Sequence, residues 1–200
     1  MTAAPSRVAE DALDLLFRHA RSHNAWLPRA VDDALLVQLY QLAKLCPTSV
    51  NGCPARFLFL RTDEAKARLL PALSPGNVEK VRSAPVAAVI AYDTRFYEHL
   101  PQLFPHSPGA GAMFEASAAL AEATAFRNSS LQGAWLILAA RALGLDCGPL
   151  SGFDAAAVNR EFFPDGRLKV NFVCNLGYGD PAGLFPRSPR LDIGQACTFL

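Results

Sequence analysis

The sequence lacks the long apolar runs and the strong net charge that would assign it to a membrane or nucleic-acid-binding class. No apolar stretch of its 200 residues approaches the length of a membrane span, and residues 1–14 lack the apolar centre of a signal peptide. The formal net charge of +1 provides no basic field to attract nucleic acid or an anionic membrane. We therefore expect a cytoplasmic protein that binds neither nucleic acid nor membrane.

Disulfide, metal and dinucleotide motifs are also missing. The five cysteines are odd in number and form no CxxC pair, so disulfides are not expected in a reducing compartment. His19 and His23 have the spacing of a two-histidine metal site on a helix, but no third ligand is near them in the sequence, and we expect no metal. Residues 177–182 fit G-x-G-x-x-A, yet too little chain follows for a dinucleotide-binding fold.

Apolar residues, in contrast, are abundant. The chain is 51% hydrophobic and 18% charged, which is enough for a sizeable core and suggests a large subunit interface as well. We expect one domain over residues 1–200, in which 177–200 form a C-terminal extension rich in glycine and proline. The extension is too irregular to be a domain of its own, and we expect it to lie across something else, such as a second subunit.

The periodicity of the apolar residues predicts a mixture of helices and strands. Residues 94–114 show no sustained period and carry several aromatic rings, which is typical of a lid over a pocket or of a dimer arm. The expected helices are 9–22, 32–45, 63–70, a short helix that opens at 77, 115–144 and one that begins at 154; the expected strands are 57–60, 86–92 and 170–176.

The segment 46–54 carries two prolines, two hydroxyl groups and an asparagine between a predicted helix and a predicted strand. A turn held by prolines at both ends and rich in hydrogen-bonding groups suits a polar ligand. On this segment alone, a plain helix-to-strand turn without a ligand is an equally good interpretation.

Four separated segments resemble, in order and spacing, the FMN-binding segments of the nitroreductase family. They are Arg21-Ser22-His23, Pro47-Thr48-Ser49-Val50-Asn51, Asn77 with Lys80, and Pro149-Leu150-Ser151-Gly152-Phe153-Asp154, followed by the tail arginines Arg187 and Arg190. The runs 21–26, 103–106, 125–130 and 144–154 resemble more closely the malonic semialdehyde reductase subgroup of pyrimidine degradation.

The resemblance implies an α+β fold with a central mixed or antiparallel sheet flanked by helices. It further implies a homodimer with two FMN sites at the interface and a C-terminal extension wrapped over the partner. Arg21, Lys80 and one tail arginine, preferably Arg190, would hold the phosphate. The backbone of 149–152 would lie beside the reactive edge of the flavin, where Gly152 allows close approach. Hydrogen bonds to the ribityl chain and the flavin edge would come from His23, Ser49, Asn51 and Asn77.

By the same resemblance, the protein would transfer hydride from NAD(P)H through FMN to a small carbonyl compound, with malonic semialdehyde reduced to 3-hydroxypropionate. A carboxylate on the substrate requires a nearby cation, for which Arg127 and His106 are the candidates. Two alternatives remain open: a general nitroreductase or quinone reductase, and an FMN-binding protein without turnover. Ala25, Cys53 and Ser151 depart from the residues common in the family, and Ser151 stands where an acid is usual.

Overall fold

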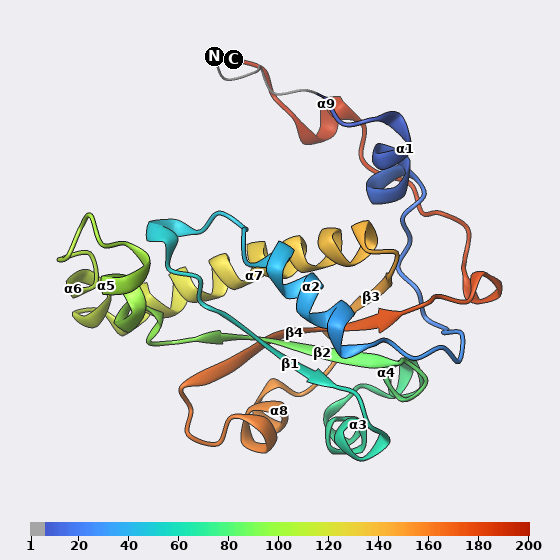
Figure 1. Ribbon diagram of the computed structural model, residues 1–200, viewed down its shortest axis with the longest axis horizontal. Coiled ribbons are helices and arrows are strands. Elements are labelled where there is room, and N and C mark those ends of the chain that lie inside the picture. Colours follow the sequence, from blue (N-terminus) through green and yellow to red (C-terminus); the bar gives the residue numbers. More distant parts are fainter. Residues whose placement is uncertain (1–6) are drawn as a thin grey trace.

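The computed structural model describes residues 7–200 and contains a four-stranded antiparallel sheet with the strand order β1-β2-β4-β3 (Figure 1). The strands are β1 (Ala55–Leu60), β2 (Val86–Asp93), β3 (Asp146–Leu150) and β4 (Leu168–Gly177). Helices cover both faces of the sheet, so the predicted α+β fold class is confirmed, with a purely antiparallel sheet.

Strand β2 is buried along its whole length because it has a neighbouring strand on each side and helices on each face. Its alternate residues enter two different cores: Val86, Ala88 and Ile90 face one, and Ala87, Val89 and Ala91 face the other. The continuous apolar run in the sequence reflects this burial on both faces.

One face of the sheet is covered by α2 (Asp33–Ala43) and by the long helix α7 (Ala118–Ala142). Leu39 and Leu136 are fully buried there against the sheet. Helix α7 begins three residues later than predicted, because the Ser117 hydroxyl accepts a hydrogen bond from the Leu120 N–H at 3.3 Å and caps it. Gly144 follows the helix with a φ of +79°, as expected for a glycine at the C′ position.

The other face is covered by α3 (Asp63–Leu69), α4 (Pro75–Arg82) and α8 (Ala155–Phe162), which contribute the buried Leu69, Val81 and Val158. Side-chain caps define the starts of two of these helices. The Thr62 hydroxyl accepts from the Ala65 N–H at 3.1 Å, as its place in the sequence predicts. The Asp154 carboxylate accepts from the Ala156 N–H at 2.9 Å.

The segment between β2 and α7 contains only short helical turns, among them α5 (Leu100–Leu103) and α6 (Ala112–Glu115). Its aromatic rings turn inward: Phe96 and Phe114 are buried, with ring centroids 5.0 Å apart, and pack with Tyr92 and the start of α7. The segment therefore has a small core of its own.

Both ends of the described chain extend from the sheet (Figure 1). The first helix is shorter than predicted, because α1 (Glu10–Leu13) is followed by a single π-helical turn that ends at Arg18. The tail beyond β4 contains α9 (Ile193–Ala196) and exposes Phe185, Ile193 and Phe199. Among residues 7–200, no helix combines the length and the apolarity needed to cross a membrane.

Candidate functional site

The segment 21–26 runs along β3, which is an outer strand of the sheet. The His23 N–H donates to the Cys147 carbonyl at 2.9 Å, and Ser22 forms an isolated parallel bridge with the same residue. A further bridge joins Trp26 to Gly179 just after β4. These backbone contacts place Arg21 beside the sheet edge and close to the beginning of the tail.

Four guanidinium groups line one cavity of about 370 Å³ at this edge, which we call the arginine cavity. They belong to Arg21, Arg141, Arg187 and Arg190, and Ser22 adds a hydroxyl. No carboxylate lines the cavity within residues 7–200. Such a concentration of positive charge without a counter-charge suits an anion with several oxygen atoms.

Arginine side chains also fasten the tail to the N-terminal segment. Arg21 donates to the Phe185 carbonyl of the tail. In the opposite direction, Arg187 Nη2 donates to the carbonyls of Arg18 and Ala20, at 2.7 and 2.9 Å. The two segments therefore fix each other's position around the arginine cavity.

The turn after β3 is fastened to the start of α4. The Gly152 carbonyl accepts one hydrogen bond from Asn77 Nδ2 at 3.0 Å and another from the Ser74 N–H at 2.9 Å. A Cβ atom at Gly152 would lie 2.6 Å from Asn77 Nδ2, so this close approach requires glycine. Before the turn, Pro149 is exposed at the sheet edge and Leu150 is half-buried, and Ser151 is exposed in the turn itself.

Lys80, one turn after Asn77 on α4, joins this region through its backbone. Its carbonyl accepts from Trp26 Nε1 at 3.2 Å and from Asn175 Nδ2 at 3.0 Å. Its side chain is half-buried and forms no ion pair with any carboxylate of residues 7–200. Lys80 therefore adds an uncompensated positive charge at the β3 side of the sheet.

Three buried polar side-chain atoms have no hydrogen-bond partner among residues 7–200. They are His23 Nδ1, Asn175 Oδ1 and Arg141 Nε. His23 contacts Asp146 through Nε2 at 3.4 Å, and its ring packs so closely on Gly179 that a Cβ there would lie 2.0 Å from Nδ1. Buried polar atoms without partners are rare. The Gly179 backbone covers His23 Nδ1, whereas Arg141 Nε belongs to a side chain that lines the arginine cavity.

The other predicted segment, 46–54, lies just before β1 at the opposite edge of the sheet. Asn51 Nδ2 donates to the Leu103 carbonyl at 2.8 Å, and the Thr48 hydroxyl accepts from the Cys53 N–H at 3.2 Å. Val50, Asn51 and Cys53 have positive φ angles of 49°, 51° and 41°. A β-branched residue in this conformation is strained, and such strain is concentrated at functional sites.

Helix α7 holds this strained loop with two buried amides. Asn128 Oδ1 accepts from the Ser49 N–H, and Gln132 Oε1 accepts from the Ala55 N–H, each at 2.8 Å. The polar residues that interrupt the first half of the predicted helix therefore include positioning groups for the loop. Pro47, Asn51 and Gln132 also line a cavity of about 620 Å³ beside it.

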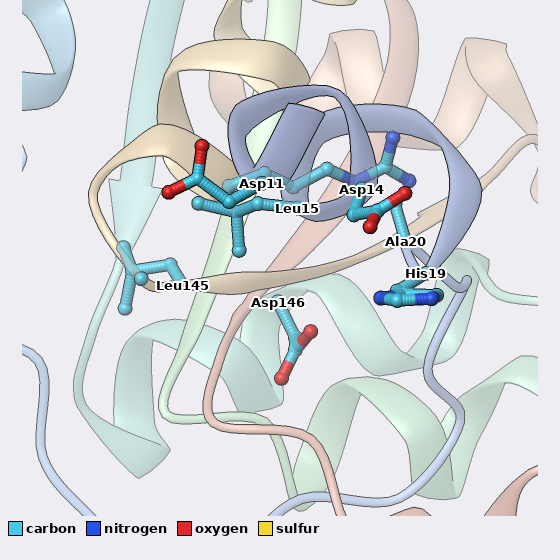
Figure 2. A pocket seen from close by; sticks show the side chains of 9 residues that line it. Asp11, Asp14, Leu15, His19, Ala20, Leu145 and Asp146 are labelled. Carbon is cyan, nitrogen blue, oxygen red and sulfur yellow. The ribbon is translucent and has the colours of Figure 1, made fainter. Parts of the chain in front are cut away.

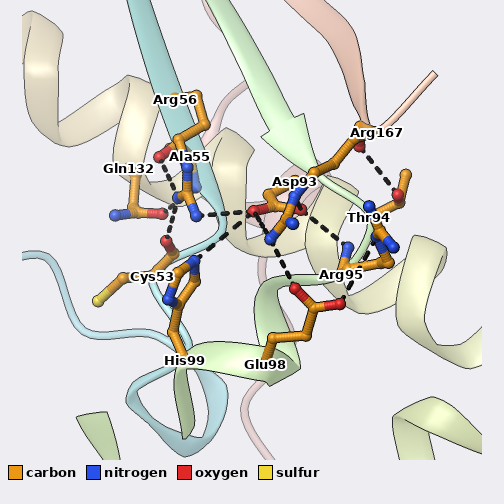
Figure 3. A network of polar contacts seen from close by, with 10 residues as sticks. All are labelled: Cys53, Ala55, Arg56, Asp93, Thr94, Arg95, Glu98, His99, Gln132 and Arg167. Carbon is orange, nitrogen blue, oxygen red and sulfur yellow. Dashed lines mark hydrogen bonds and ion pairs between the residues drawn. The ribbon is translucent and has the colours of Figure 1, made fainter. Parts of the chain in front are cut away.

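A network around Asp93 connects the loop to the rest of the sheet (Figure 3). The buried Asp93 carboxylate accepts from Arg56 Nη2 at 2.8 Å and from Arg167 Nε and Nη2, both at 3.1 Å. Burial opposes the ionisation of Asp93 and by itself would raise the pKa of this carboxyl. The opposite effect is larger and lowers the pKa: it comes from the hydrogen bonds of Arg167 and the Arg95 N–H and from the charges of Arg56 and Arg167. Arg56 also donates to the Cys53 carbonyl at 3.1 Å, so the network reaches the strained loop directly.

Next to the arginine cavity lies a second cavity, of about 510 Å³, which no sequence motif predicted (Figure 2). Asp11 and Asp14 of the N-terminal turns, His19 and Asp146 line it. Arg141 lines both this acidic cavity and the arginine cavity, and so stands between them.

The two candidate substrate-binding residues lie elsewhere. Arg127 is exposed on α7 and forms no ion pair or hydrogen bond within residues 7–200, while its helical neighbours Ala123 and Leu131 are exposed and apolar. His106 is exposed between α5 and α6, with its ring centroid 3.9 Å from that of Phe104.

The structure thus brings the predicted site residues together in two groups. Within one chain these groups lie at opposite edges of the sheet. One group surrounds β3 and contains Arg21, Ser22, His23, Asn77, Lys80, Pro149, Leu150, Ser151, Gly152, Arg187 and Arg190; the other precedes β1 and contains Pro47, Thr48, Ser49 and Asn51.

Sequence reasoning missed Arg141, Arg56 and the loop-holding role of Asn128 and Gln132. The only signal for Arg141 was a basic residue in the last turn of a helix, which is equally explained by the helix dipole. For the two amides, the signal was their position inside an apolar helix, where a polar group needs a partner.

Comparison with known proteins gives a consistent result. The model of the Nitroreductase family matches residues 17–178. A protein of Burkholderia lata, named as a candidate NADH dehydrogenase/NAD(P)H nitroreductase, is 60% identical over 185 residues, which cover 92% of this chain and 94% of the relative. The protein HadB of Ralstonia pickettii, with the same descriptive name, is 57% identical over 190 residues, covering 94% of this chain and 97% of the relative.

Solved structures share the fold at low sequence identity. The crystal structure of a candidate nitroreductase from Exiguobacterium sibiricum in complex with FMN has a TM-score of 0.86 and 22% identity, covering 98% of this chain and 100% of that chain. The Nitroreductase Family Protein from Streptococcus pneumoniae has a TM-score of 0.79 and 22% identity, with 92% and 98% of the two chains covered.

Proposed function

The chain belongs to the nitroreductase family, and from this premise we propose that two copies of it form an FMN-dependent NAD(P)H oxidoreductase whose substrate is a small carbonyl compound. The preferred substrate is malonic semialdehyde, which would be reduced to 3-hydroxypropionate. FMN, when bound, supplies a centre that takes a hydride from NAD(P)H and delivers it to the second substrate.

The observation that carries the proposal is the separation of the two groups of candidate residues at opposite edges of one sheet. Within one chain the two groups do not share a cavity, because the arginine cavity and the cavity beside the strained loop have no lining residue in common. In a homodimer, the strained loop before β1 of one copy would meet the β3 edge of the other and complete the site.

An exposed apolar surface on α2 and α7 supports such a dimer. Val37 and Tyr40 on α2, with Leu131 and Trp135 on α7, are large apolar side chains that lie exposed in the single chain. Monomeric proteins rarely expose a surface of this kind, whereas homodimer interfaces are rich in it. The tail, with Phe185 and Phe199 exposed, would add to the contact.

The residues of the β3 edge fit FMN. The arginine cavity offers guanidinium groups and a hydroxyl for the phosphate. Asn77 and Ser74 hold the Gly152 backbone in place, and this backbone would lie beside the flavin when FMN is bound. These residues would bind and orient the flavin; none of them needs to transfer a proton during hydride transfer.

Arg127 is the better placed of the two candidates for the substrate carboxylate. Its guanidinium has no anionic partner within residues 7–200 and lies among exposed apolar neighbours on α7. When the dimer covers this surface, a desolvated arginine needs an anion, and a carboxylate of the substrate would provide one. His106, whose ring contacts Phe104, is the other candidate for the carboxylate.

A general nitroreductase is the second candidate, because the relatives carry NAD(P)H nitroreductase in their names. It would need an accessible aromatic surface on which a nitroaromatic compound can stack. Within the segment 92–114, the rings of Tyr92, Phe96 and Phe114 are buried in their own cluster, so these three rings offer no such stacking surface.

The decisive experiment begins with the absorption spectrum of the purified protein, followed by anaerobic addition of NADPH or NADH. We expect a flavin spectrum that bleaches on addition and a dimer on gel filtration. The ratio of kcat/KM for malonic semialdehyde and a nitrofuran then separates the two candidates. A colourless monomer that takes up no FMN contradicts the proposal, and flavin that is not bleached leaves a binding protein without turnover.

Kinetics of Arg127→Ala test the substrate site. We expect KM for malonic semialdehyde to rise about tenfold or more, while KM for an uncharged aldehyde stays unchanged, because the lost contact is made only with the carboxylate. Arg127→Lys keeps the charge and should recover part of the loss. An unchanged KM for the acid aldehyde removes Arg127 from the site.

A further inference from the structure

Arg141 is placed for a role that its position in the sequence does not reveal. It lies in the last turn of α7 and lines both the arginine cavity and the acidic cavity. The one hydrogen bond of its side chain within residues 7–200 runs from Nη1 to the Leu16 carbonyl and is long, at 3.4 Å. Its Nε is buried and has no partner in the same part of the chain.

The unused part of this guanidinium is the edge formed by Nε and Nη2. Two parallel N–H groups on that edge match two oxygen atoms of a carboxylate or a phosphate. Carboxylates are available nearby, because Asp11, Asp14 and Asp146 line the acidic cavity. None of them lies within ion-pair distance of Arg141, whereas the arginine cavity on its other side is lined by three further guanidinium groups and by no carboxylate of residues 7–200.

The other arginines of the cavity already have structural partners. Arg21 and Arg187 donate to backbone carbonyls that fasten the tail, and Arg190 Nη1 donates to the carbonyls of Ser188 and Pro189. The Arg141 and Arg21 side chains each make one hydrogen bond, against two each for Arg187 and Arg190, and the Arg141 bond is the longest of these. Arg141 also stands on a long buried helix, which fixes a side chain more rigidly than a tail does.

We propose that Arg141 is a phosphate-binding residue of the flavin site, with the Nε–Nη2 edge directed at the phosphate monoester of FMN. This inference rests on the proposed function and adds one residue to it. Arg141 thereby makes the site selective for the phosphorylated flavin over riboflavin, and links the end of α7 to the arginine cavity.

Flavin titrations followed by fluorescence quenching test the assignment, with FMN and riboflavin as the two ligands. The proteins are the wild-type dimer, Arg141→Gln, Arg141→Lys and, as a matched charge control, Arg160→Gln on the exposed side of α8. For Arg141→Gln we expect an FMN dissociation constant raised about 10- to 100-fold, with riboflavin affinity unchanged. Arg141→Lys keeps the charge but loses the bidentate contact. Its FMN dissociation constant should therefore lie between those of the wild type and Arg141→Gln.

Two results overturn the inference while leaving the proposed function intact. One is an unchanged FMN affinity in Arg141→Gln. The other is an equal loss of affinity for FMN and for riboflavin, which would show a purely structural role. Wild-type protein that binds neither flavin refutes the proposed function instead. Thermal unfolding shows whether Arg141→Gln folds. If it does not, the test is the ratio of the FMN and riboflavin dissociation constants of Arg141→Lys. A ratio equal to that of the wild type contradicts a phosphate-binding role for Arg141.

Discussion

Replacing Asp93 with asparagine removes the centre of the polar network in Figure 3 while keeping the shape of the side chain. The buried carboxylate accepts hydrogen bonds from Arg56, Arg167 and the Arg95 N–H, at 2.8 to 3.1 Å. Breaking a buried charge pair costs about 3–5 kcal/mol, but both arginine side chains are about one-third exposed, so solvent screening lowers this figure. We expect Asp93→Asn to reduce the free energy of unfolding by about 2–4 kcal/mol.

The loss should depend on pH in a defined direction. Because the pKa of Asp93 is lowered in the folded protein, its stabilisation is fully present above the unfolded value of about 3.9 and is lost as the pH falls through the folded value. The difference in unfolding free energy between wild type and Asp93→Asn should therefore be constant near neutral pH and shrink below about pH 4.

Urea unfolding at one protein concentration measures both quantities, because flavin binding and subunit association would otherwise shift the midpoint. The control is Glu161→Gln, which breaks the exposed ion pair with Arg68 and should cost about 0–1 kcal/mol. A cost for Asp93→Asn no greater than that of the control would refute the reasoning. So would a difference that persists unchanged in acid.

Three further substitutions test the packing and the caps. Gly133→Ala would place a Cβ 2.5 Å from the Phe172 ring and should lower the unfolding free energy by about 1–3 kcal/mol in urea; no loss would mean that the ring can move aside freely. Gly152→Ala would place a Cβ 2.6 Å from Asn77 Nδ2 and so disturb the turn after β3. We expect FMN to bind about tenfold more weakly in a fluorescence titration. An unchanged FMN affinity would contradict a role for this turn in binding. Asp154→Ala removes two hydrogen bonds at the start of α8 and should cost about 1 kcal/mol, measured against Asp154→Asn, which retains the cap; equal stabilities would rule the cap out.

Much of the fold could be predicted because local signals and tertiary packing agree. The apolar run of β2 is buried on both faces, and Thr62 caps α3 as its position suggests. Strand β3 was missed because Gly148 and Pro149 have low strand propensity. The sheet tolerates Pro149 there because β3 is an outer strand, where one side of the backbone has no strand to pair with.

The candidate site was only partly predictable for a different reason. Short motifs identified the residues around Arg21 and Asn51, because each lies in a compact segment with an unusual composition. Arg141 and Arg56 acquire their roles from contacts with residues far away in the chain, so nothing adjacent in the sequence marks them. The long-range pairing of β1 with β2 and of β3 with β4 creates these contacts.

The placement of the two residue groups at opposite edges of the sheet has a genetic consequence. In the homodimer proposed above, a chain damaged only near Asn51 and a chain damaged only near Arg21 would each be inactive when paired with a copy of itself. Combined in one mixed dimer, they would leave one site with both defects and the other with none. Two null alleles of this gene, expressed in the same cell, should therefore complement each other and restore part of the activity.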